Sequence, residues 1–418
     1  MVVFEHERIR VGQDVDGQEL TQRQFDAIAR WKERTNHPGL EIGHHSIRTS
    51  QWVGVLQVGR TTIEILPKAD ARRGQENLDR RQLVQHWKFV LLDMLAALKG
   101  FDLHASSRAQ LHLQSHTLLD IFFSAYVEEA QSLLHEGLAK TYRHVAKNRT
   151  AWRGRFVVGE NLRRNLTHQE RVYTEAIEYD IHNVWNRILV IGLRLVAMRA
   201  ESGLLRSRAK SLLLPYQEWV TGAVRSEDFE RLRYDRRTER YRNAMDLAKL
   251  LLLRQNPDLC AGREDVFALL FDMNDLWEAW VAQEVRKSLK GKSWTLKTQS
   301  ARHFWHAKGC RKTVRPDLVL EPRDDDALPL EHLLGIEPLK AITVLDTKWK
   351  VLSQVSPSDA DLKQMYVYNK RWKAEHSWLV YPNVHNLSPT RGTFVDDGTH
   401  CGIAFVDLPK PKAVKRPT

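Results

Sequence analysis

The C-terminal half of the chain alternates short apolar runs with longer amphipathic segments. Two segments keep apolar residues at helical spacing: one is capped by Asp272 or Asn274 and runs to about Leu289, and the other spans residues 359–373. The short runs are rich in β-branched and aliphatic residues, which is typical of buried strands. They are residues 294–299, 314–320, 342–348, 378–382 and 402–406. We therefore predict a central sheet flanked by helices in this half.

The N-terminal half begins with a β-rich pattern. Residues 51–59 alternate in part between apolar and polar positions, and residues 61–68 follow a turn at Gly59-Arg60, which indicates a β-hairpin. Between Leu20 and Trp31 the pattern predicts a short amphipathic helix with Thr21 as its N-cap. The chain as a whole is predicted to be of the α+β or α/β class. Core helices are expected at residues 82–98, 118–138, 183–199 and 244–253.

The composition is that of an ordinary globular protein with a basic surface. The 418 residues suffice for two or three domains, and 42% of them are hydrophobic while 28% are charged. The net charge of +12 favours a polyanionic partner. No apolar run is long enough to span a bilayer, and the N-terminus lacks a signal-peptide core, so no membrane partner is expected. Three widely spaced cysteines predict a cytoplasmic location.

Candidate chemistry lies where two predicted strands carry acidic residues. Asp346 and Lys348 are two positions apart in an apolar strand, so their side chains point to the same face. Asp317 follows Pro316 at the start of the preceding strand. If the two strands are neighbours, these carboxylates and the lysine converge and can hold Mg²⁺ for phosphodiester hydrolysis. An Asp–Lys ion pair at a strand end is the alternative.

Two predicted helices carry further polar candidates. Gln364 and Tyr368 are four residues apart and therefore share one helix face, from which they can hydrogen-bond DNA or hold the lysine. Glu278 follows Trp277 beside the apolar face of the helix that precedes the first core strand. Taken alone, this glutamate can equally be a surface residue.

These motifs together resemble a known nuclease family. Pro316-Asp317 followed by Asp346-Thr347-Lys348 is similar to the PD-(D/E)xK motif, and Gln364 with Tyr368 resembles the Gln-x-x-x-Tyr element of its RecB-like branch. The surrounding segments "RPDLVL", "VLDTKWK", "DLKQMYVYNK", "MNDLWEAWV" and "WVGVLQVGRTTIEILPK" resemble the McrC family. McrC is the nuclease subunit of McrBC modification-dependent, type IV restriction systems, which act in antiphage defence.

The resemblance implies roles for the candidate residues. Asp317 and Asp346 would bind Mg²⁺, with Mn²⁺ as an alternative and the Thr347 carbonyl as a further ligand. Lys348 would position or activate the attacking water. Glu278 would bind the metal directly or through water. Gln364 and Tyr368 would assist the other catalytic residues.

The resemblance also implies how the chain is divided. It predicts a β-rich N-terminal domain at residues 1–75 and a helical and β-finger extension at 76–180 that docks on a motor. An endonuclease domain follows at 181–408, with its core at 272–408. Residues 409–418, which are basic and proline-rich, are predicted to be a disordered tail.

The expected partners are double-stranded DNA, in methylated form, and an AAA+ GTPase motor that resembles the McrB hexamer. The motor must be another chain, because no nucleotide-hydrolysis motif is found. Gly291-Lys292-Ser293 mimics the end of a P-loop, but Arg286 stands where the earlier glycine is required. The modified base and the recognition sequence are not predicted.

Several alternatives stay open at this point. The basic segment 137–172 can contact DNA phosphates or the motor. His303, His306 and Cys310 lack the fourth ligand of a usual zinc site, so a basic loop facing DNA is favoured there. For the whole protein, the rivals are a stand-alone PD-(D/E)xK nuclease and a non-catalytic DNA-binding adaptor of a motor.

Overall fold

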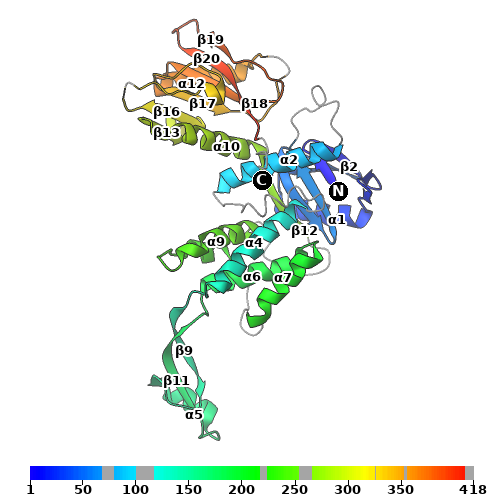
Figure 1. Ribbon diagram of the computed structural model, residues 1–418, viewed down its shortest axis with the longest axis vertical. Helices are drawn as coiled ribbons and strands as arrows, with labels where there is room; N and C mark the ends of the chain where they lie inside the picture. Colours follow the sequence, from blue (N-terminus) through cyan, green and yellow to red (C-terminus); the bar gives the residue numbers. More distant parts are fainter. Residues whose placement is uncertain are drawn as a thin grey trace, which may run out of the picture. The chain divides into compact units, whose positions relative to one another are not determined.

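The chain forms two compact units, Met1–Gly100 with Arg263–Thr418 and Phe101–Gly262. The computed structural model in Figure 1 describes residues 1–67, 80–99, 117–216, 224–253, 266–324, 326–352 and 355–409. The predicted disordered tail lies outside the described residues except for Pro409. The first unit thus joins the two ends of the sequence, whereas the predicted boundaries at 75 and 180 stay predictions.

The N-terminal part of the first unit is built on the predicted hairpin. Strands β7 (Trp52–Val58) and β8 (Thr61–Leu66) pair in antiparallel fashion around Gly59, whose φ of 60° suits the tight turn. β1 (Val2–Phe4) adds to β8 in parallel. Helix α1 (Gln22–Thr35) packs its apolar face on this sheet and begins with a capping box at Thr21, as predicted. Short strands complete this part: β2 (Arg8–Arg10), β3 (Asp14–Val15), β4 (Gln18–Glu19), β5 (Leu40–Gly43) and β6 (Ser46–Thr49).

One strand that the sequence did not predict links this sheet to the C-terminal half. β12 (Val266–Asp272) pairs with β7 along its whole length, from Val266 opposite Val58 to Asp272 opposite Trp52. Asp272 then caps helix α10 (Met273–Ser288), which is one of the two caps that the sequence offered. The first turn of α10 is therefore held by the N-terminal sheet, and the position of Glu278 on this helix depends on that sheet.

The C-terminal half contains a six-stranded mixed sheet in the order β13-β16-β17-β18-β20-β19. β17, β18 and β20 run parallel, and the pairs β13–β16, β16–β17 and β19–β20 are antiparallel. Helices α10 and α12 (Asp359–Trp372) flank the sheet, which confirms the predicted fold class (Figure 1). The strands are β13 (Trp294–Thr298), β16 (Leu318–Pro322), β17 (Thr343–Thr347), β18 (His376–Asn383), β19 (Thr390–Thr393) and β20 (His400–Asp407).

Two excursions leave this sheet. Between β13 and β16 the chain forms a separate hairpin of β14 (Arg302–Ala307) and β15 (Cys310–Val314), where the sequence had predicted a loop. The segment 321–340, between β16 and β17, contains α11 (Glu331–Leu334). It is anchored by buried leucines, since Leu328, Leu330 and Leu334 are fully buried.

Helix α2 (Arg80–Lys99) and β1 connect the N-terminal sheet to the end of β17. Trp349, the residue after Lys348, donates a hydrogen bond from Nε1 to Oε1 of the buried Glu5 at 2.8 Å. Its ring also meets the rings of Trp87 on α2 and Trp277 on α10. The chain directly after Lys348 is thus fixed by contacts with three segments outside the six-stranded sheet.

We expect Trp349→Phe to lower the free energy of unfolding by about 1.5–3 kcal/mol, because a hydrogen bond to a buried carboxylate is lost while most of the ring packing is kept. Urea unfolding of the variant and the wild type measures this loss. Trp152→Phe, at an exposed tryptophan, is the control and should leave the midpoint unchanged. An equally small effect at both positions would contradict the structural role of Trp349.

The second unit combines a helical core with an extended β-ribbon, which we call the finger (residues 141–180; Figure 1). In the finger, β9 (Thr141–Arg149) and β11 (Val172–Asp180) pair over nine residues, and β10 (Arg155–Phe156) and α5 (Val158–Asn165) lie at the far end. Gly154 has a φ of 77°, and a Cβ there would lie 2.2 Å from the Glu175 carbonyl oxygen, so glycine is required. The helical core consists of α4 (Leu118–His135), α6 (Val184–Arg199), α7 (Gly203–Leu213) and α9 (Arg242–Leu253), with α8 (Ser226–Glu230), η1 (Leu214–Tyr216) and η2 (Glu239–Tyr241).

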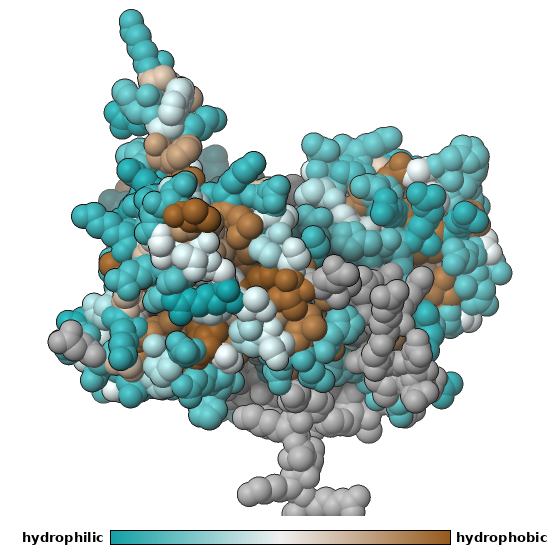
Figure 2. Space-filling model, turned by 90° about the horizontal axis from the view of Figure 1, so that it is seen from above, coloured by the Kyte–Doolittle hydropathy of each residue, from teal (hydrophilic) through white to brown (hydrophobic). Residues whose placement is uncertain are grey.

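The surface carries small apolar groups within a largely hydrophilic covering on the face shown in Figure 2. Seven of the fourteen large apolar side chains exposed among the described residues belong to the finger: Tyr142, Trp152, Val158, Leu162, Leu166, Ile177 and Tyr179.

In the described part of the chain, no helix combines the length and the apolar character needed to cross a membrane.

Candidate active site

Antiparallel pairing of β16 and β17 brings the two predicted aspartates together. Leu318 lies opposite Leu345, so the next positions outward along the two chains are Asp317 and Asp346. The carboxylate of Asp317 accepts hydrogen bonds at Oδ2 from the backbone N of Thr347 at 2.7 Å and from its Oγ1 at 2.8 Å. Asp317 is thereby held against the end of β17, at the position expected from the sequence.

Glu278 joins this site through a residue that the sequence analysis missed. Gln299, directly after β13, donates from Nε2 to Glu278 Oε1 at 2.6 Å and to Asp317 Oδ1 at 3.3 Å. Its backbone has a φ of 51° and donates its N–H to the Asp317 carbonyl at 2.9 Å. A glutamine in the left-handed region is uncommon, and here it holds two carboxylates in place. Its position at the end of the first core strand was the available sequence signal.

Lys348 lies on the other side of Asp346. Its Nζ is 2.8 Å from Asp346 Oδ2 and 3.5 Å from Asp361 Oδ1, and it donates to Gln364 Oε1 at 3.3 Å. Asp361, in the first turn of α12, was not predicted to belong to the site. Its spacing of three residues from Gln364 on the same helix was the signal that could have indicated it.

The Gln-x-x-x-Tyr pair continues this chain of hydrogen bonds. Gln364 Nε2 donates to the Tyr368 hydroxyl at 2.7 Å, and that hydroxyl donates to the carbonyl of Arg315 at 3.0 Å. The two residues therefore tie Lys348 to the segment that leads into Asp317. In the structure Gln364 contacts the lysine and Tyr368 contacts Gln364, and the role of the pair stays a prediction.

Replacing Tyr368 with phenylalanine removes this hydroxyl. For the nuclease expected from the sequence, the single-turnover rate of DNA cleavage should fall by about 10-fold, since a hydrogen bond contributes about 1–1.5 kcal/mol. Tyr366→Phe is the matched control on the same helix, because its ring packs on Phe394 away from Gln364. Equal rates for Tyr368→Phe and the wild type would show that the chain of hydrogen bonds is dispensable.

Burial and mutual repulsion perturb the ionisable groups of the site. Burial, with the Asp317 carboxylate nearby, raises the pKa of Asp346 to about 6 although Lys348 acts against it. Burial likewise raises the pKa of Glu278 to about 7, opposed by the Gln299 hydrogen bond and helped by Asp317. Burial lowers the pKa of Lys348, but the neighbouring carboxylates outweigh it and leave this pKa above its ordinary value. Such shifts in one cluster are typical of functional sites.

The carboxylates of Asp317, Asp346 and Glu278 are ligands of the type that a hard divalent cation prefers. Oδ2 of Asp346 is buried without a well-formed hydrogen bond, and the Lys348 ammonium is what compensates its charge. Within the described ranges, no three Asp, Glu, His or Cys side chains are already gathered closely enough to hold a metal. The Gln299 amide nitrogen donates to both Glu278 and Asp317 and so links these two carboxylates. Oxygen donors of this kind suit Mg²⁺ or Mn²⁺.

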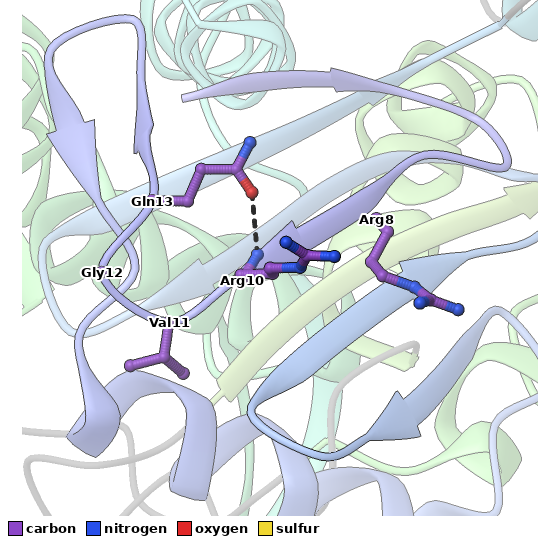
Figure 3. A pocket seen from close by; sticks show the side chains of 5 residues that line it. All are labelled: Arg8, Arg10, Val11, Gly12 and Gln13. Atoms are coloured by element: carbon purple, nitrogen blue, oxygen red, sulfur yellow. Dashed lines mark hydrogen bonds between the residues drawn. The ribbon is translucent and has the colours of Figure 1, made fainter.

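A hollow elsewhere on the first unit offers different chemistry (Figure 3). Arg8 and Arg10 point outward from β2 on either side of the buried Ile9. Gln13 accepts a hydrogen bond from the Arg10 backbone N at 3.0 Å. The residues that line it are Arg8, Arg10, Val11, Gly12 and Gln13, and its two arginines make this surface basic.

Comparisons with known proteins agree with this fold. The model of the family described as McrBC 5-methylcytosine restriction system component matches residues 47–382. No curated protein matches the chain. A chain in the refined half-complex from a tetradecameric assembly of Thermococcus gammatolerans McrB AAA+ hexamers with bound McrC is similar at 20% identity and a TM-score of 0.69, covering 97% of this chain and 94% of that chain. A chain of the cryo-EM structure of the Thermococcus gammatolerans McrBC complex is 22% identical with a TM-score of 0.51, covering 69% of this chain and 88% of that one.

Proposed function

Because the chain belongs to the family of McrBC 5-methylcytosine restriction system components, we propose that it is the Mg²⁺-dependent DNA endonuclease subunit of such a system. The family match confirms the resemblance to McrC that the sequence indicated. The observation that carries the proposal is the convergence of Asp317, Asp346 and Lys348 where the adjacent strands β16 and β17 meet at one end of the six-stranded sheet. Glu278 and Gln364 complete this group.

In the proposed reaction, a water molecule attacks the phosphorus in line with the departing oxygen. A Mg²⁺ ion held by Asp317, Asp346 and the Thr347 carbonyl, with Glu278 beside them, would neutralise charge on the phosphate. Lys348, whose raised pKa keeps it protonated at neutral pH, would orient the water and stabilise negative charge. Gln364 and Tyr368 keep the ammonium in place.

We further infer that cleavage requires an AAA+ GTPase motor, because the similar chain comes from an assembly of McrB AAA+ hexamers with bound McrC. The finger is the proposed docking element. Six of its seven arginines are paired with carboxylates. Arg143, Arg149 and Arg155 pair with Asp180, Glu178 and Glu175 of β11, and Arg163, Arg164 and Arg171 pair with Glu160 or Glu170. Its exposed apolar residues fit a protein partner better than DNA phosphates. This favours the motor over DNA as the partner of the basic segment 137–172.

Plasmid cleavage by the purified chain, with and without the NTPase encoded next to it, tests the proposal. The assay uses Mg²⁺, GTP or ATP, and methylated or unmethylated DNA, with Asp346→Ala as the control. We expect cleavage only with partner, nucleotide, methylated DNA and an intact Asp346. Cleavage by the chain alone, indifferent to methylation, would instead support a stand-alone nuclease. Stimulation of the partner's NTPase without any cleavage would support an adaptor.

A further inference from the structure

The hairpin of β14 and β15, which we call the aromatic hairpin (residues 302–314), is inserted directly into the candidate active site. It leaves the sheet after Gln299, which binds Glu278 and Asp317. It returns at Arg315, whose carbonyl accepts the Tyr368 hydroxyl, and Asp317 follows two residues later. Any strand of DNA whose phosphate reaches Asp317 therefore passes the base of this hairpin.

The charge of the aromatic hairpin fits a nucleic acid. No aspartate or glutamate occurs from Gln299 to Pro316, whereas five basic residues do: Arg302, Lys308, Arg311, Lys312 and Arg315. None of these five forms an ion pair with a carboxylate of the described residues. The arginines of the finger, by contrast, are mostly paired. Unpaired cations beside the carboxylate cluster favour binding of phosphates.

Two large aromatic side chains stand out on this basic hairpin. Phe304 is 52% exposed and Trp305 is 50% exposed, although both have β-propensity and could pack in a core. A β-bulge between His303 and Trp305 breaks the register at Phe304. Bulges near active sites commonly re-aim side chains, and here the bulge accompanies two adjacent exposed rings.

The hairpin is held firmly at its base, so these rings are presented from a defined position. Arg302 donates to the carbonyl of Arg371 at 2.6 Å and lies over the Trp372 ring at 4.8 Å. Arg371 in turn donates to the carbonyl of His303. All these contacts are with the last turns of α12, the helix that carries Gln364 and Tyr368.

We propose that the aromatic hairpin is a DNA-binding wedge, in which Phe304 and Trp305 stack on nucleobases beside the scissile phosphate. Lys308, Arg311 and Lys312 would contact the flanking phosphates. Exposed aromatic rings among cations are the usual means of holding unstacked bases. The position of the wedge beside the cleaved phosphate rests on the proposed nuclease function. Stacking of this kind would distort the duplex when the substrate binds.

Fluorescence anisotropy of labelled duplex DNA with the full chain in EDTA measures binding without cleavage. Phe304→Ala/Trp305→Ala should weaken binding by about 10- to 100-fold and leave the slope of log K against log salt unchanged. Lys308→Glu/Arg311→Glu should instead reduce that slope. Trp305→Phe should retain most of the affinity. Trp152→Ala, at an exposed tryptophan of the finger, should bind like the wild type.

Photocrosslinking to DNA that contains 5-iodouracil tests the stacking itself. We expect a crosslinked peptide that includes Trp305, and its loss in Trp305→Ala. The proposal is overturned if the double alanine variant binds DNA with wild-type affinity. If that variant loses only binding to the motor, the two rings belong to a protein interface. If the double variant loses DNA binding and the wild-type chain never cleaves DNA, the wedge is supported and the nuclease function is rejected.

Discussion

Replacing Asp346 with asparagine is expected to reduce DNA cleavage about 10³-fold or more while leaving the metal-free protein at least as stable as the wild type. The loss follows because metal coordination contributes several kcal/mol of transition-state stabilisation, and each 1.36 kcal/mol is tenfold in rate. The amide keeps the shape of the side chain but offers no charge to a cation. Single-turnover cleavage with the partner NTPase present measures the rate.

The stability of this variant has a predictable dependence on pH. The pKa of Asp346 is raised from 3.8 to about 6, so the folded protein holds this proton more tightly than the unfolded chain does. As pH rises from about 4 to about 6, ionisation therefore costs the wild type stability. The asparagine amide does not titrate, so the stability of Asp346→Asn relative to the wild type should increase over this interval and then level off. Thermal unfolding in EDTA between about pH 4 and pH 8 measures the difference.

Addition of Mg²⁺ separates the two possible roles of Asp346. If Asp346 is a metal ligand, Mg²⁺ should raise the unfolding temperature of the wild type but not that of Asp346→Asn. If the Asp346–Lys348 ion pair has only a structural value, the variant should be less stable than the wild type above about pH 6, where Asp346 is ionised, and Mg²⁺ should have no differential effect. Cleavage by Asp346→Asn at the wild-type rate would show that Asp346 takes no part in the reaction.

The sequence predicted the parts of the site that depend on local spacing. Asp346 and Lys348 share a face because strand side chains alternate, and Gln364 and Tyr368 share a face because of the helical repeat. The convergence of Asp317 required one further assumption, that consecutive strands are neighbours, which holds in most sheets. These relations need only a few adjacent residues, and the structure places all of them as expected.

The features that were missed depend on contacts between distant segments. β12 pairs with β7, more than two hundred residues earlier, and its apolar run carries no mark of its partner. Gln299 has a left-handed backbone conformation and binds two carboxylates that lie on other elements. The neighbouring sequence indicates neither feature. The β14–β15 hairpin was predicted to be a loop because its outward rings and cations lack the apolar alternation of a strand with one buried face.

Replacing Lys348 with methionine should lower DNA cleavage by about 10²- to 10⁴-fold, the range expected when a positioned proton donor is lost. The methionine side chain has similar length but cannot orient a water or balance negative charge. Its effect on substrate binding should be small, because Mg²⁺ and DNA are held by other residues in the proposed site. Cleavage rates, Mg²⁺-dependent shifts in unfolding temperature and DNA anisotropy together test this separation.

Lys350→Met is the matched control for Lys348→Met. Lys350 lies two residues later and would share a face with Lys348 if β17 continued, but the strand ends at Thr347. Lys350 is exposed, whereas Lys348 contacts Asp346, Asp361 and Gln364. Cleavage should therefore survive in Lys350→Met and fail in Lys348→Met. The reverse result would transfer the catalytic role to Lys350, and equal losses would show that the two variants act through net charge on DNA binding rather than through the reaction.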